Sequence, residues 1–268
     1  MKIMEFSLAG ILILAITTHA AEAALLGRLD DGNGNFLAYY DDMLGITLLT
    51  DANLAASMDF GVSGIGVGGF AGRMDVATAD EWLLAMNNYN GTGYMGISTW
   101  RLPLTGPIDN IAYDTTGTIM NYDGTTDIGY NISASGTTYA GNTYSEMAYL
   151  YYNTLGNKGK IAVDGTDPQT GYKNRNWESF INVELHRYLS GSEYDADHIF
   201  GFSMGAGQQL LLLKDPGTSV TDTGFVWAVA TGDIAALTVP VPLPAAIWLF
   251  ATGLLSMAGV ARRKRKAG

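Results

Sequence analysis

Apolar segments near both ends of the chain limit the part that can fold as a water-exposed domain. Near the start, Lys2 precedes an apolar stretch over residues 6–18, and Ala21 and Ala23 form an A-x-A cleavage pattern. This order predicts a secretory signal peptide over residues 1–23, with a retained membrane anchor as the alternative. Either interpretation places the middle of the chain outside the cytoplasm.

The other end of the chain has three adjoining parts. Residues 239–245 are rich in proline, residues 246–261 are apolar and uncharged, and residues 262–268 form a basic tail. Prolines continue neither a helix nor a sheet ladder, so the first part should stay extended. The second part has the length of a short transmembrane helix. The cations that would hold its far end on the cytoplasmic side are Arg262, Arg263, Lys264, Arg265 and Lys266.

The proline-rich part contains the run Val241, Pro242, Leu243, Pro244 and Ala245. Together with the apolar segment and the basic tail, this run resembles the PEP-CTERM sorting signals of bacterial surface proteins, in the Val-Pro-Leu-Pro-Ala variant. The resemblance implies an exosortase-type membrane protease as partner and cleavage near the motif. It also implies transfer from the inner membrane to the cell surface or extracellular matrix. A plain C-terminal anchor is the alternative.

Residues 24–238 form the expected exported domain, which is long enough to bury a sizeable core. The two ends hold six of the 15 basic and two of the 26 acidic residues, so this domain has a net charge of about −15. Such an acidic surface disfavours nucleic acid as a partner. The chain has no cysteine, which excludes disulfides, thiol chemistry and cysteine-ligated zinc.

Short strands are expected through much of this domain. An Asp-Gly-Asn-Gly turn at residues 31–34 separates two apolar segments, which predicts a β-hairpin. The segments with strand character are residues 25–29, 36–40, 46–49, 188–189, 198–204, 209–213 and 225–230.

Two segments have the apolar spacing of helices. Residues 76–87 follow Asp75, a suitable N-cap, and residues 144–155 begin at a capping box made by Thr143 and Glu146. Strands around two helices predict an α+β domain with twisted antiparallel hairpins. We expect Trp82 and Trp100 to be buried in its core.

Several short motifs in a consistent order resemble the Lcl C-terminal domain family, formerly a domain of unknown function. They lie at residues 39–53, 72–74, 100–103, 142–147, 151–156, 190–194, 227–229 and 232–233. The chain departs from the family pattern at Leu48, Leu189 and residues 230–231, where the family has aromatic or basic residues or proline. The family is similar to C-type-lectin-like domains. The resemblance therefore implies a compact α+β fold with two helices, twisted hairpins and long loops.

Residues 201–205 fit the G-x-S-x-G pattern, which makes Ser203 the candidate nucleophile of a serine hydrolase. In that architecture the catalytic histidine follows the serine, whereas His186 and His198, the only histidines of the exported domain, precede it. Apolar residues alternate before and after the turn at residues 205–207, which favours a β-hairpin. We therefore expect no enzymatic activity.

Two groups of oxygen-bearing side chains are candidates for binding Ca²⁺. Glu193, Asp195 and Asp197 lie close together in the chain, and Asp31 with Asn33 is the second choice. Clustered carboxylates repel one another, and a calcium ion would relieve that repulsion. Solvated loops and a hairpin turn are the alternatives. If calcium binds, it should raise the melting temperature.

Six tyrosines are candidates for presenting rings to a sugar: Tyr149, Tyr151 and Tyr152, with the nearby Tyr130, Tyr139 and Tyr144. Tyr149 and Tyr152 share a helix face, so core burial of at least one of them is the alternative. The sequence favours an exported, non-enzymatic cell-surface or extracellular-matrix protein. Its domain could bind extracellular polysaccharide or act in adhesion. A structural matrix component without a specific ligand is the second hypothesis, and a serine hydrolase using Ser203 is a remote third.

Overall fold

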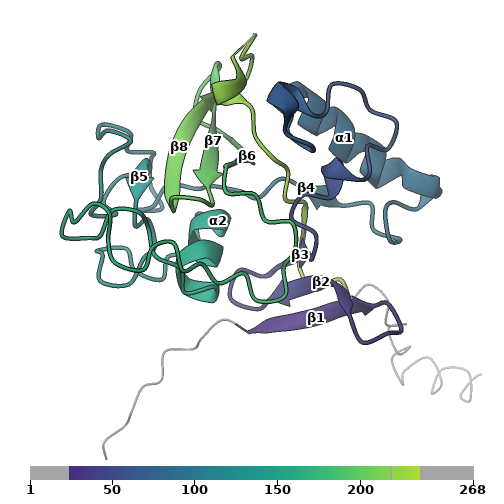
Figure 1. Ribbon diagram of the computed structural model, residues 1–268, viewed down its shortest axis with the longest axis horizontal. Coiled ribbons are helices and arrows are strands. Elements are labelled where there is room, and N and C mark those ends of the chain that lie inside the picture. The colour runs from purple at the N-terminus through teal and green to yellow at the C-terminus, as the bar shows by residue number, and fades with distance from the viewer. Residues whose placement is uncertain (1–23, 218, 236–268) are drawn as a thin grey trace, which may run out of the picture.

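The structure, a computed structural model, describes residues 24–217 and 219–235. These residues form two helices and two antiparallel sheets, so the predicted α+β class is confirmed (Figure 1). The expected signal peptide, sorting motif, transmembrane helix and basic tail all lie outside the described residues. Within the described part of the chain, no helix has the length and hydropathy to cross a bilayer.

The first sheet joins the start of the domain to its end. The strands that form it are β1 (Leu25–Asp30), β2 (Phe36–Asp41), β3 (Ile46–Leu49), β9 (Val229–Thr231) and β4 (Trp100–Arg101), in that spatial order. The predicted hairpin is confirmed as β1 and β2, with Arg28 opposite Ala38. β9 lies between β3 and β4 and is antiparallel to both.

The second sheet consists mainly of the later strands. Its spatial order is β5 (Gly129–Tyr130), β8 (Gln208–Leu213), β7 (His198–Ser203) and β6 (Arg187–Glu193). The segment before β9 connects the two sheets, because Phe225 pairs beside Tyr188 of β6 before the chain enters the first sheet. The predicted strand over residues 225–230 is therefore too long: only its end, from Val229, is continuous strand.

Helix α1 (Val76–Asn88) begins where the sequence predicts. The side chain of Asp75 accepts a hydrogen bond from the backbone N–H of Thr78 at 2.8 Å, which caps the first turn. The apolar face of α1 buries Trp82 and Met86 completely. Trp100, in β4, is also buried, so both tryptophan predictions are confirmed.

Helix α2 (Glu146–Tyr149) is shorter than predicted and continues as a π-helical turn, Leu150–Thr154. The predicted Thr143–Glu146 capping box is wrong. Ser145 is the N-cap and accepts from the N–H of Ala148 at 3.3 Å. The carboxylate of Glu146 instead binds Arg101 through two 2.8 Å hydrogen bonds, because the first sheet brings that guanidinium within reach.

The central strands are buried on both faces. Ile46 and Leu48 of β3 belong to one apolar cluster, whereas Leu49 belongs to another. The first cluster is covered by α2 and the π-helical turn, and the second by α1. Because successive side chains of a strand point to opposite faces, the two helices cover opposite sides of the same strands. This arrangement fixes the end of β3, where the candidate site begins.

Candidate binding site

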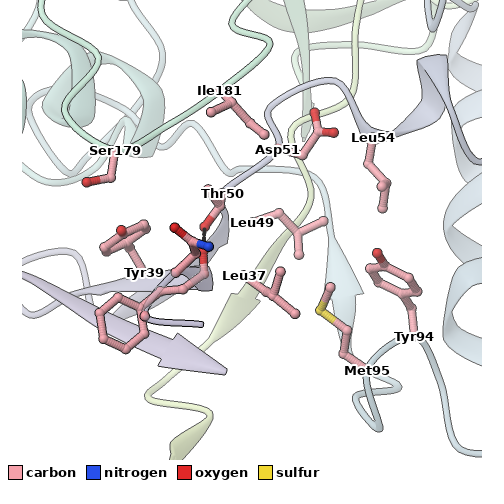
Figure 2. Close-up of a pocket in the computed structure, with 13 residues that line it drawn as sticks. Leu37, Tyr39, Leu49, Thr50, Asp51, Leu54, Tyr94, Met95, Ser179 and Ile181 are labelled. Atoms are coloured by element: carbon pink, nitrogen blue, oxygen red, sulfur yellow. Dashed lines mark hydrogen bonds between the residues drawn. The ribbon is translucent and has the colours of Figure 1, made fainter. Parts of the chain in front are cut away.

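A cavity of about 610 Å³ opens where β2, β3 and four connecting segments meet (Figure 2). Leu37 and Tyr39 of β2 form one part of its wall, and Leu49 at the end of β3 forms another. The remaining lining residues are Phe36 of β2, Leu54 of a short 3-10 turn, and the loop residues Gly34, Asn35, Thr50, Asp51, Tyr94, Met95, Ser179 and Ile181. Segments that are far apart in the sequence thus form one concave surface, as is typical of ligand sites.

Hydrogen bonds hold the walls of this cavity in place. The backbone N–H of Thr50 donates to the carbonyl of Leu37 at 3.0 Å, and its hydroxyl donates to the carbonyl of Phe36 at 2.7 Å. Ile181 pairs beside Asp51: its N–H donates to the Thr50 carbonyl at 2.9 Å, and its carbonyl accepts from Ala52 at 3.0 Å. The cavity is therefore preformed by backbone pairing.

Among the lining residues that the structure describes, Asp51 supplies the one carboxylate. Its Oδ1 accepts the N–H of Asn53 at 2.9 Å and its Oδ2 accepts the side-chain amide of Asn182 at 3.0 Å. Each carboxylate oxygen has a second lone pair, so the half-buried group can still accept a hydrogen bond from a ligand. Among the described lining residues none is Lys, Arg or His. The cavity therefore favours neutral ligands over anions.

Two tyrosine rings are held at fixed positions in the wall. Tyr39 packs edge-to-face against Phe36 and Phe180, with centroid distances of 5.9 and 5.6 Å. Tyr94 packs in the same way against Phe60 at 5.4 Å. Within the described residues, neither tyrosine hydroxyl has a hydrogen-bond partner. Burial, followed by the nearby charge of Asp51, raises the pKa of the Tyr94 hydroxyl, so it stays a neutral donor.

The second-choice calcium residues, Asp31 and Asn33, lie in the turn between β1 and β2. Asp31 Oδ1 accepts the backbone N–H groups of Asn33 at 2.7 Å and Asn35 at 3.2 Å. Its Oδ2 accepts the side-chain amide of Asn35 at 3.0 Å. These bonds, with the Asn35 amide as the largest cause, lower the pKa of Asp31. The carboxylate thus organises the turn that places Asn35 at the cavity.

The first-choice calcium residues lie at and beyond the end of β6, and two of them have partners there. Glu193 pairs with Lys214 at 2.9 Å, and Asp195 accepts from the ring of His198 at 2.9 Å. The His198 bond is the main cause that lowers the pKa of Asp195. Asp197 follows in the same turn. In the described part of the chain, no three acidic or histidine side chains are grouped to hold a metal ion.

Ser203 ends β7, and the chain turns directly into β8, with Ser203 paired opposite Gln208. The hairpin prediction is confirmed, whereas a nucleophile elbow requires a strand followed by a helix. His186 packs against Phe70, and His198 pairs with Asp195. No histidine among the described residues hydrogen-bonds to Ser203.

Most of the tyrosines proposed from the sequence as a sugar platform are buried. Tyr130, Tyr149, Tyr151 and Tyr152 lie in the core, where Tyr151 and Tyr152 pack against Phe202, whereas Tyr144 is exposed. Sequence reasoning missed Asp51 and Tyr94. Their only local signal is a tyrosine in a glycine-rich stretch and an Asp-Ala-Asn turn.

The chain matches no protein-family model, no curated protein and no solved structure at a significant level. The cavity is therefore the main guide to its function.

Proposed function

We propose that residues 24–238 are the exported, non-enzymatic domain of a cell-surface or matrix protein, and that this domain binds carbohydrate in the cavity. The observation that carries the proposal is the combination of Tyr39 and Tyr94 rings with the Asp51 carboxylate in one preformed hollow. A sugar ring has apolar C–H faces and hydroxyl edges. Aromatic side chains complement the faces, and a carboxylate accepts hydrogen bonds from the hydroxyls.

The resemblance to the Lcl C-terminal and C-type-lectin-like families supports binding by fold analogy, which is weaker support than the site itself. The composition of the lining also agrees with a neutral polysaccharide. Of the described lining residues only Asp51 carries a charge at neutral pH. Acidic polysaccharides would be repelled by this group and by the acidic surface of the domain.

We expect the purified chain to retain neutral glycans on an array, and Tyr94→Ala to weaken that binding about tenfold, or about 1.4 kcal/mol. Removing the ring deletes a stacking surface and a free hydroxyl from the cavity wall. Tyr144→Ala is the matched control, because Tyr144 is 41% exposed and lies outside the lining residues. Equal losses in the two variants would contradict a site in this cavity. A folded chain that retains no glycan would favour the structural matrix component.

The proposed destination depends on the chain end rather than on the cavity. We propose that an exosortase-type protease cleaves near Val241–Ala245 and that the domain then leaves the inner membrane. Mass spectrometry of protein taken from the cell surface should therefore show a chain lacking Arg262–Lys266. A surface-exposed form that still carries the basic tail would contradict this processing and support a plain membrane anchor.

A further inference from the structure

The wall of the cavity contains a turn with an unusual residue. The N–H of Ile97 donates to the carbonyl of Tyr94 at 3.1 Å, which closes a tight turn with Met95 and Gly96 at its centre. Both central residues have positive φ, +58° at Met95 and +78° at Gly96. Turns of this kind favour Asn, Asp or Gly at both positions, because a larger side chain clashes with its own backbone. Methionine at position 95 is therefore conformationally strained.

Met95 places its side chain in the cavity wall (Figure 2). It is half-buried and packs against the apolar cluster that includes Leu49 and Leu54. Figure 2 shows Leu37, Leu49 and Met95 near one another in the cavity, with Tyr94 beside Met95. The cavity therefore contains an apolar patch formed by Leu37, Leu49 and Met95. Strained residues cluster at functional sites, so a strained residue in the cavity wall indicates a functional role for Met95.

An unsubstituted hexose fits this apolar patch poorly. It presents hydroxyl groups around its whole edge, and a hydroxyl placed against Leu37, Leu49 or Met95 would lose water without gaining a partner. A methyl group in the same place would instead gain from leaving water. Methionine suits such a contact, since its flexible, polarisable thioether adapts to irregular shapes.

We infer that the cavity selects sugars that carry a methyl-bearing substituent, and that Met95 contacts this substituent. The inference rests on the proposed carbohydrate binding and deepens it by naming the ligand class. The class comprises 6-deoxy, O-methyl and N-acetyl sugars, because each places a methyl group at the edge of the ring. Strain at Met95 is the conformational cost of presenting an apolar side chain at this point of the turn.

Calorimetric titration of the full chain with matched sugars tests the inference. The pairs are L-fucose with L-galactose, 3-O-methylglucose with glucose, and N-acetylglucosamine with glucose. We expect the methyl-bearing member of at least one pair to bind about fourfold more tightly, the value for one buried methyl-sized group. Met95→Asn should remove that preference, whereas Met95→Leu, which keeps an apolar side chain, should retain it.

The melting temperatures of the same variants, measured by thermal unfolding, test whether each variant is folded. Met95→Asn should melt at a higher temperature than Met95→Leu, because asparagine tolerates positive φ. Equal binding within every pair, with binding still dependent on Tyr94, would overturn the inference and leave the proposed function standing. A preference that persists in Met95→Asn would overturn the role of Met95. Binding of no sugar at all would overturn both proposals.

Discussion

Replacing Trp227 with alanine should lower the free energy of unfolding by about 4 kcal/mol. Trp227 is 1% exposed and lies in the segment between β8 and β9, whose Phe225 pairs beside Tyr188 of β6. Its ring packs edge-to-face on Phe180 at 4.9 Å, and its indole N–H donates to the Leu49 carbonyl at 2.8 Å. Alanine would leave a void and an unpaired carbonyl at Leu49, a residue of the cavity wall. Urea denaturation followed by fluorescence would measure the loss.

Trp227→Phe separates the two contributions. It keeps an aromatic ring in the core but removes the indole N–H, so we expect a loss of about 1–2 kcal/mol from the unpaired Leu49 carbonyl and imperfect packing. A Trp227→Ala variant that is no less stable than Trp227→Phe would show that this segment does not join the two sheets as described.

Glu146→Ala should lower the free energy of unfolding by about 2–3 kcal/mol. The Glu146 side chain is 12% exposed and binds Arg101 through two hydrogen bonds. It also accepts the backbone N–H of Leu104 at 2.7 Å. Without this carboxylate, the partly buried Arg101 guanidinium loses its charged partner and keeps only its bonds to Thr231 and the Leu102 carbonyl, and the Leu104 N–H loses its acceptor. Chemical denaturation at low and at high salt would measure the change.

The pair between Lys214 and Glu193 provides the control for Glu146. The Glu193 side chain is 69% exposed, so its charge is already well hydrated. Glu193→Ala should therefore change stability little, and salt should weaken whatever effect remains. Similar losses for Glu146→Ala and Glu193→Ala would mean that the contact between α2 and the first sheet is not the stabilising interaction we describe.

Local sequence patterns correctly predicted those elements whose first residues are fixed by hydrogen bonds from neighbouring side chains. The Asp-Gly-Asn-Gly turn predicts the β1–β2 hairpin, because Asp31 bonds to the backbone of the same turn. Asp75 predicts the first residue of α1 for a similar reason. The start of α2 was mispredicted because two hydroxyl residues, Thr143 and Ser145, are both plausible caps. The tertiary contact with Arg101 takes Glu146 out of the capping box, and no local pattern reports it.

The cavity could not be predicted from the sequence, because it too depends on contacts between distant segments. Its walls depend on pairing between Asp51 and Ile181, which are far apart in the sequence, and on the conformation of a turn at Met95. Hydrophobic periodicity shows neither which distant segment pairs with Asp51 nor how the Met95 side chain is oriented. Tyr149, Tyr151 and Tyr152, which form a cluster in the sequence, are buried, whereas Tyr94, a half-buried ring of the site, lies in a glycine-rich stretch.

The position of β9 has a consequence for the order in which the protein can be made. β3 and β4 do not touch each other in the first sheet, because β9 occupies the place between them. Until Val229–Thr231 emerges, each of them has an open edge with unpaired backbone groups. The sheet therefore cannot close before β9 has been synthesised. Nearly the whole domain must leave the ribosome before the native topology is available, and the nascent chain needs protection from pairing with its neighbours during that interval.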